Sequence, residues 1–245
     1  MVEILQIQMK KILYFLIMLQ CIACTDRNSK DPYPYTFESI KNYNGTAVEM
    51  LSQYVKDNDT LAIKHFLKDK PSVSIDTKDK YFGHSLLMWA IYNGKYEAFH
   101  CLLNNGANPN FVGNYRHETP LYLASQYLGH DYETDARYCK ELLEHGADPN
   151  KFAPLEVAVV NDLEYTKLLI EYGANYNKKN GRDSYANLAI IQCKDDIAEY
   201  LIIEKKAVLY SAPYFDFWNL KDPRVALIKK KIEDYLNCHP EQLKY

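Results

Sequence analysis

The chain has 245 residues, of which 47% are hydrophobic and 25% are charged, a composition typical of folded proteins with one large domain or two small ones. Its formal net charge of −3 argues against nucleic-acid binding, which usually requires a clear basic excess. Tyrosine is frequent, with 22 copies, and glycine is scarce, with 9. Each glycine is therefore a candidate for a backbone position that needs a positive φ.

Residues 1–23 are predicted to be an export signal that does not belong to the fold. Lys10 and Lys11 precede an apolar run over residues 12–19, and this run is too short to span a bilayer comfortably. The letters CIAC end at Cys24 and resemble the bacterial lipobox, whose cysteine becomes lipidated, although Cys21 stands where Leu or Val is usual. A plain secretory signal or an uncleaved anchor is the alternative. Removal of residues 1–23 takes away two lysines and one glutamate and leaves a net charge of −4.

Residues 24–46 are expected to be a tether between the lipid and the folded part of the chain. Residues 25–36 are polar, contain prolines and show no hydrophobic periodicity, as is typical of a linker. The folded domain is then expected over residues 47–210, followed by a connector and a capping helix in residues 211–245.

A ten-residue pattern occurs three times: CLLNNGANPN from Cys101, ELLEHGADPN from Glu141 and LLIEYGANYN from Leu168. The glycines of the three copies are 40 and 27 residues apart, with a mean interval of 33.5. A repeat of about 33 residues, built from a turn and two helices, is the ankyrin period. The chain resembles the ankyrin-repeat family over residues 85–110, 119–150 and 153–177, with a degraded copy at 184–207 and an N-terminal helix pair at 47–77.

The resemblance implies an all-α fold: a solenoid of stacked helix pairs with short hairpin loops, about five repeats and a C-terminal capping helix. The motif residues fit this fold. Thr119 can cap a helix that has Pro120 at its first position, and Gly146 can end the second helix of its pair in a left-handed conformation. Leu121 and Leu142 are expected to face inward, and stacking is obligatory because one helix pair cannot bury its apolar face alone.

The spacing between motif residues locates the irregular parts of the solenoid. From the alanine of the first helix to the terminal glycine there are 16 residues between Ala90 and Gly106, but 22 between Ala124 and Gly146. An insertion between the two helices is therefore expected at residues 129–137, and the hairpin loop after Gly146 is nearly absent.

The last predicted helix covers residues 222–238. Asp222 is expected to cap it, Pro223 takes its first position, and residues 229–231, three lysines, are expected on its solvated side. Residues 212–220, before it, are predicted to be an irregular connector that packs aromatic side chains onto the last repeat. The apolar stripe of the helix consists of Val225, Ile228, Ile232 and Leu236.

No pattern in the sequence indicates catalysis, a cofactor or a metal site. Asp131, Glu133 and Asp135 have the alternate spacing of a calcium loop, but the required glycine is missing and Leu142 stands at the closing Glu position. The seven histidines form no ligand pair at helical spacing. No disulfide framework is expected among Cys101, Cys139, Cys193 and Cys238.

The ankyrin resemblance implies a non-enzymatic module that binds another protein, with contacts to the membrane only through the N-terminal lipid or signal segment. We expect display as a lipoprotein of the bacterial cell envelope; the alternatives are a secreted effector directed at a host and an immunity protein that neutralises an interbacterial toxin. In this family the partner lies across the hairpin tips and the exposed side of the first helices. The corresponding positions are Tyr81, Phe82, His84, Tyr92, Asn93, Tyr115, Arg116, Glu118, Gln126, Tyr127, Asn161, Asp183 and Gln192, with Phe152, Val160, Asn180 and Ile191 at further such positions.

Overall fold

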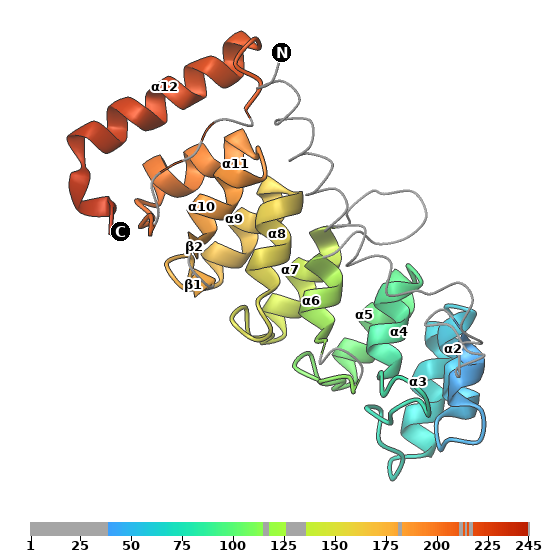
Figure 1. The fold of residues 1–245 in the computed structure, drawn as a ribbon. Coiled ribbons are helices and arrows are strands. Elements are labelled where there is room, and N and C mark those ends of the chain that lie inside the picture. The colour runs from blue at the N-terminus through green and yellow to red at the C-terminus, as the bar shows by residue number, and fades with distance from the viewer. Residues whose placement is uncertain are drawn as a thin grey trace, which may run out of the picture. The chain divides into compact units, whose positions relative to one another are not determined.

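The computed structural model describes residues 39–114, 118–125, 136–180, 183–210, 213, 215 and 218–244, without the side chains of residues 179, 180 and 183. Within the unit formed by Phe37–Tyr245, helix pairs follow one another along the chain (Figure 1). The pairs are α2 (Glu49–Lys56) with α3 (Thr60–Asp69), α4 (Leu86–Tyr92) with α5 (Tyr96–Asn104), α6 (Pro120–Ser125) with α7 (Ala136–Glu144), α8 (Pro154–Asn161) with α9 (Leu163–Glu171), and α10 (Tyr185–Ile191) with α11 (Asp195–Glu199).

Shorter elements complete the described part of the chain. A π-helical turn, η2 (Tyr200–Glu204), continues α11, and α12 (Pro223–Cys238) follows. Two 3₁₀ turns, η1 (Ile40–Tyr43) and η3 (Pro240–Gln242), lie near the two ends. Strands β1 (Lys179–Asn180) and β2 (Asp183–Ser184) pair antiparallel within one hairpin loop.

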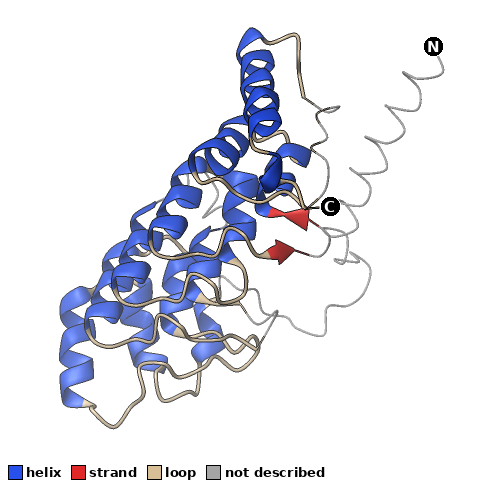
Figure 2. Ribbon diagram, turned by 90° about the vertical axis from the view of Figure 1, so that its left-hand side faces the viewer, coloured by secondary structure: helices blue, strands red, loops and turns tan. Residues whose placement is uncertain are grey.

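The helices form two layers, with the hairpin loops projecting on one side (Figure 2). Helices α4, α6, α8 and α10 contact one another in succession and form the first layer, and α3, α5, α7, α9 and α11 form the second. The predicted all-α solenoid of five helix pairs is confirmed, since the strands of the described residues are only two residues long and belong to a loop.

The helix ends follow the predicted capping chemistry. Thr119 accepts a hydrogen bond from the Tyr122 N–H (3.2 Å), and α6 begins at Pro120. Three helices of the second layer end at glycines with φ of 88° at Gly106, 84° at Gly146 and 92° at the equivalent position of the next repeat. This left-handed conformation closes the helix and lets the backbone turn into the loop.

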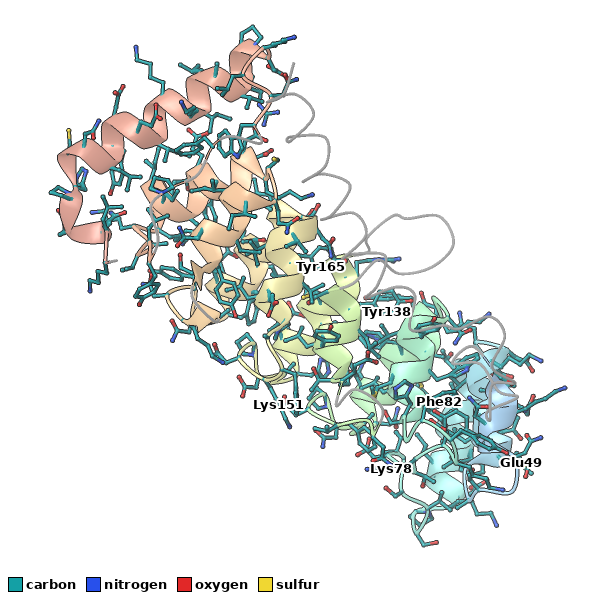
Figure 3. All side chains as sticks on the ribbon, in the orientation of Figure 1. Glu49, Lys78, Phe82, Tyr138, Lys151 and Tyr165 are labelled. Atoms are coloured by element: carbon teal, nitrogen blue, oxygen red, sulfur yellow. The ribbon has the colours of Figure 1, made fainter. Side chains whose placement is uncertain are left out.

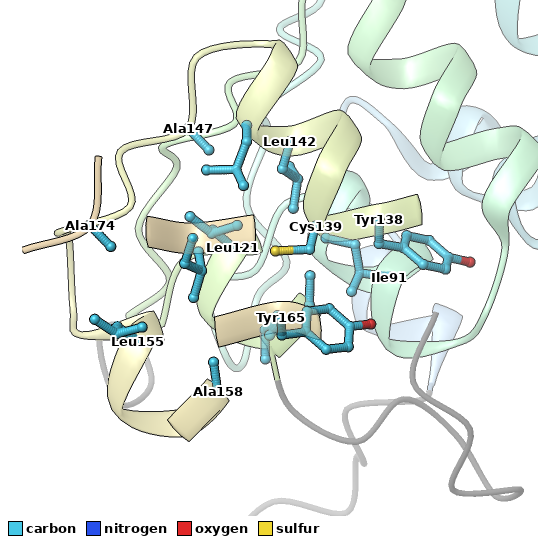
Figure 4. Packing of buried hydrophobic residues seen from close by; sticks show 14 of the residues in the cluster. Ile91, Leu121, Tyr138, Cys139, Leu142, Ala147, Leu155, Ala158, Tyr165 and Ala174 are labelled. Carbon is cyan, nitrogen blue, oxygen red and sulfur yellow. The ribbon is translucent and has the colours of Figure 1, made fainter. Parts of the chain in front are cut away.

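One apolar core runs through the repeats (Figure 4). Leu121 and Leu142 are almost completely buried, as the repeat pattern predicts. Tyr138 and Tyr165 are buried as well and lie with them in the view of Figure 4. Burial of a leucine side chain contributes about 1.5–3 kcal/mol, so this shared core holds neighbouring repeats together.

Asparagine side chains join consecutive hairpin loops. The Asn110 amide donates to the Gly146 carbonyl (2.8 Å) and accepts from the Asp148 N–H (2.8 Å). Asn150 makes the same two bonds to the next loop, at 3.1 and 2.8 Å, and Asn177 accepts an N–H bond from the segment after η2 (2.9 Å). These bonds join loop to loop, so the different spacing of the helices within each repeat does not interrupt them.

The folded unit begins before residue 47, the boundary predicted from the sequence. Ile40 is 8% exposed and Tyr43 is 1% exposed, and the Tyr43 hydroxyl donates to the His84 carbonyl (3.1 Å). Residues 40–43 therefore pack on the N-terminal helix pair and are not part of a tether, because η1 contacts α2 and both side chains belong to the apolar core. The remainder of the predicted tether lies outside the described residues.

The C-terminal helix has the predicted start and stripe. Asp222 caps α12 by accepting the Arg224 N–H (2.8 Å), and Ile228, Ile232 and Leu236 are buried. The predicted solvated lysines are partly engaged: Lys229 pairs with Glu233 (3.1 Å) within the helix and Lys231 pairs with Glu199 of α11 (3.0 Å).

The described part of the connector packs on the last repeat, as predicted. Trp218 is buried, its indole N–H donates to the Ile190 carbonyl (2.9 Å), and the Phe215 ring meets it edge-on at 4.9 Å. Across the described residues, every helix is too short or too polar to cross a bilayer. The predicted export signal and the lipidation residue Cys24 lie outside the described residues.

Candidate partner-binding face

The face predicted to bind a partner consists of the hairpin loops and the exposed side of the first-layer helices. We call this surface the finger face. Its four loops are the first finger (residues 70–85), the second finger (105–119), the third finger (145–153) and the fourth finger (172–184).

A buried carboxylate shapes the first finger. Asp79 is 6% exposed; one of its oxygens accepts the Tyr81 and Phe82 N–H groups (both 2.7 Å) and the other accepts the His84 N–H (2.6 Å). Gly83, with φ of 69°, makes the turn possible. The burial of Asp79 is hard to predict from the sequence, because an aspartate before an aromatic pair and a glycine also occurs in ordinary exposed turns.

Three residues expected to face outward are buried: Phe82, His84 and Glu118. The His84 Nε2 atom lies 3.8 Å from the Glu118 carboxylate, and the rings of Phe82 and His84 are tilted at 6.2 Å. The His84 and Glu118 side chains therefore connect the first and second fingers, and the burial of all three residues corrects the outward placement expected from the sequence. Burial lowers the pKa of His84, while the Asp79 carboxylate acts in the opposite direction, so the imidazole is neutral at pH 7.

Other predicted residues do lie at the surface. Tyr92 at the end of α4 is 37% exposed, and Phe152 in the third finger is 44% exposed. The neighbouring Asn93 is half-buried and donates to the Trp89 carbonyl (3.0 Å). Half-buried positions are also occupied by Tyr81, Val160, Asn161, Ile191 and Gln192.

Several predicted positions cannot be placed. Tyr115, Arg116, Gln126 and Tyr127 lie outside the described residues, as do residues 129–135 of the predicted insertion. Asn180 and Asp183 are placed by their backbones in β1 and β2.

The third finger is short and strained. Phe152 and Ala153 both have left-handed backbones, with φ of 56° and 53°, a conformation that costs a non-glycine residue about 1–2 kcal/mol. Lys151, before them, donates from Nζ to the Asn110 carbonyl of the second finger (2.9 Å). The chain thus makes a tight turn without a glycine at residues 152–153, and an exposed aromatic ring follows Lys151.

A family model described as ankyrin repeats, in three copies, matches residues 50–153. Residues 50–153 are thus similar to ankyrin repeats. Ankyrin repeats generally bind other proteins and are generally a non-enzymatic interaction fold. The same helix pairing continues beyond the matched segment, through α8 to α11. No curated protein matches the chain.

An open groove in the second helix layer lies away from the fingers. Its volume is about 690 Å³ and it runs between α7 and α9. The basic residues along it are engaged elsewhere: Arg137 lies over the Tyr96 ring (4.2 Å), Lys140 pairs with Glu144 (3.9 Å), and Lys167 lies over a tyrosine ring of η2. The groove is lined by Glu164 and Glu171 as well as by these three basic residues, so its lining carries charges of both signs.

The cysteines of the described residues are free thiols. Burial raises the pKa of Cys101 and raises that of Cys139 to about 12, so both act as small apolar core residues rather than nucleophiles. No group of three or more potential metal ligands occurs among the described residues.

Proposed function

We propose that the ankyrin repeats bind a partner protein across the finger face and that the chain is displayed as a lipid-anchored protein of the bacterial envelope. The observation that supports binding is the exposure of two aromatic side chains, Tyr92 at the end of the first-layer helix α4 and Phe152 in the third finger. Rigid aromatic side chains supply large contact area at low entropic cost and are enriched among the residues that dominate binding energies. Further proposed contact residues are Tyr81, Asn93, Tyr115, Arg116, Gln126, Tyr127, Asn161, Asp183 and Gln192.

Site-specific photo-crosslinking tests this proposal in cells that express the full chain. A photoreactive amino acid is placed at Tyr92 or Asn161 on the finger face, and at His65 or Glu97 on the second helix layer as matched controls, because both control residues are exposed. We expect one protein adduct of the same mass from both finger-face positions and none from the controls. Adducts only from the control positions, or from none, would contradict the proposal.

Envelope display rests on the two lysines, the short apolar run and Cys24 in the first 24 residues. Metabolic labelling with radioactive palmitate tests it: the wild-type chain should carry the label and Cys24→Ser should not. A secreted effector would carry no lipid, so an unlabelled wild-type chain would overturn the lipoprotein assignment and favour secretion.

A further inference from the structure

We infer that the partner presents an acidic segment with an apolar side chain to the finger face, with the carboxylates near Lys78 and Lys151 and the apolar side chain near Phe152. This inference rests on the proposed function and adds the chemistry of the partner. It follows from three features: the distribution of charge, the surroundings of the two lysines, and the strained third finger.

Charge is distributed unequally between the two sides of the molecule. Two of the five carboxylates in the fingers, Asp79 and Glu118, are buried and serve the fingers themselves. In the second layer, α11 and η2 carry four carboxylates, of which Asp195, Asp196 and Glu199 pair with Arg224 and Lys231 of α12. The finger lysines are Lys70, Lys78, Lys80, Lys151, Lys178 and Lys179, and the remaining finger carboxylates are Asp76, Asp148 and Asp183.

The first-layer helices add little charge to the finger face. Glu156 is the charged residue of α8, and α4, α6 and α10 contain none. Lys70, Lys78, Lys80 and Lys178 are exposed and Lys151 is half-buried. Although the chain as a whole is negative, these lysines make the finger face suitable for an acidic ligand.

Lys78 and Lys151 approach the second finger from the two neighbouring loops. The Lys78 ammonium donates to the Asn114 side-chain oxygen (2.9 Å) and lies 5.4 Å from the centre of the Phe111 ring. The Lys151 ammonium donates to the Asn110 carbonyl (2.9 Å). Figure 3 shows both lysines along the edge where the loops project.

The acceptors of these two lysines are neutral. No carboxylate of the described residues pairs with Lys78 or Lys151, whereas Lys140, Lys229 and Lys231 on the helices all form ion pairs. An ammonium group that donates to neutral acceptors keeps its positive charge. It also keeps the N–H donors that those acceptors do not use. A partner carboxylate can therefore add an ion pair without displacing an internal one.

The third finger supplies the apolar part of the site. Phe152 directly follows Lys151, and its left-handed backbone would cost less with glycine or asparagine at this position. Strain of this kind persists where the surrounding structure holds it, and it is concentrated at binding sites. The strained turn sets an exposed aromatic ring beside a lysine, which suits an acidic segment that also contains an apolar residue.

The test uses photo-crosslinking from Tyr92 in the full chain, combined with charge reversal. Lys78→Glu/Lys151→Glu changes the finger face, and Lys64→Glu/Lys68→Glu makes the same change in net charge on α3 of the second layer, where both lysines are exposed. We expect the adduct yield to fall about tenfold, as for loss of paired interface charges, in the finger variant and to change less than about twofold in the control. The milder Lys78→Gln/Lys151→Gln should give an intermediate yield, and thermal unfolding must show that each variant folds.

The outcomes separate this inference from the proposed function. Equal adduct yields in the wild type and the finger variant, or equal losses in the finger and control variants, would overturn the acidic partner but leave binding on the finger face intact. So would a crosslinked partner peptide, identified by mass spectrometry, without an excess of Asp and Glu, or an adduct that nuclease removes. An absence of any adduct from Tyr92 in the wild type would instead contradict the proposed function itself.

Discussion

At the scale of single residues, the last repeat has no glycine after its second helix, whereas the three preceding repeats each have one. Lys206 precedes Ala207 as Gly106 precedes Ala107, and it holds the same left-handed backbone, with φ of 55°. The Ala207 N–H donates to the Leu201 carbonyl (2.9 Å), the counterpart of the bond that Ala107 makes. The degraded last repeat thus keeps the shape of the turn at a cost in backbone strain.

Lys206→Gly should therefore stabilise the protein by about 1 kcal/mol, the penalty of a left-handed backbone for a residue with a Cβ atom. Urea unfolding monitored by circular dichroism measures the change. Lys206→Ala is the control, because it removes the same side chain and keeps the strain. An equal gain in both variants would show that the side chain, and not the backbone, causes the effect.

His84 gives the stability a dependence on pH. Burial lowers the pKa of His84 in the folded state, so the unfolded chain binds more protons as pH falls below about 6.5, the ordinary histidine value. The contribution of the neutral His84 is complete above that pH and is lost as the pH falls toward the lower, folded pKa. We expect His84→Gln to lose less stability than the wild type between pH 7 and pH 5.5 in urea unfolding. A parallel decline in both proteins would contradict this role.

At the scale of elements, α12 closes the last repeat mainly by apolar contact. Ile232 is completely buried, while Arg224, which pairs with Asp196 at 3.0 Å, is 63% exposed, and exposed ion pairs contribute little because water and salt screen them. The packing of α12 on α11 thus depends on the predicted apolar stripe.

Ile232→Ala should lower the free energy of unfolding by about 2–5 kcal/mol, the range for loss of a large aliphatic side chain from a core. Arg224→Ala should have a clearly smaller effect. Thermal and urea unfolding of both variants measure the difference. A larger loss for Arg224→Ala would mean that the ion pairs, rather than the stripe, hold the helix.

The elements predictable from the sequence are those with local signals. Thr119 before Pro120, and the glycines that follow α5, α7 and α9, mark helix ends through the chemistry of their own backbones, and the structure has these ends where they are predicted. The start of the folded unit is different, because Ile40 and Tyr43 become core residues only through contact with helices formed later in the chain. The same limit applies to His84, whose burial depends on the neighbouring finger.

At the scale of the whole molecule, the core joins the repeats and the fingers form the surface that is proposed to bind a partner. The shared core and the asparagine bonds between loops make successive fingers one continuous surface. Phe152 and the finger lysines belong to that surface, and Tyr92 lies at the end of the first-layer helix α4. A partner that spans several fingers gains contacts from each repeat at once, which is how a row of similar small units can bind a partner tightly.

The central claim, that a partner protein binds across the finger face, is tested most directly by affinity. The protein crosslinked from Tyr92 would be purified, and its dissociation constant measured by calorimetry for the wild type, Tyr92→Ala, Phe152→Ala and the control Leu61→Ala, an exposed apolar residue of α3. We predict at least a tenfold loss of affinity for Tyr92→Ala or Phe152→Ala, as for an aromatic residue at the centre of an interface, and less than a twofold change for Leu61→Ala. Wild-type affinity in both finger-face variants, with a loss in the control, would contradict the claim.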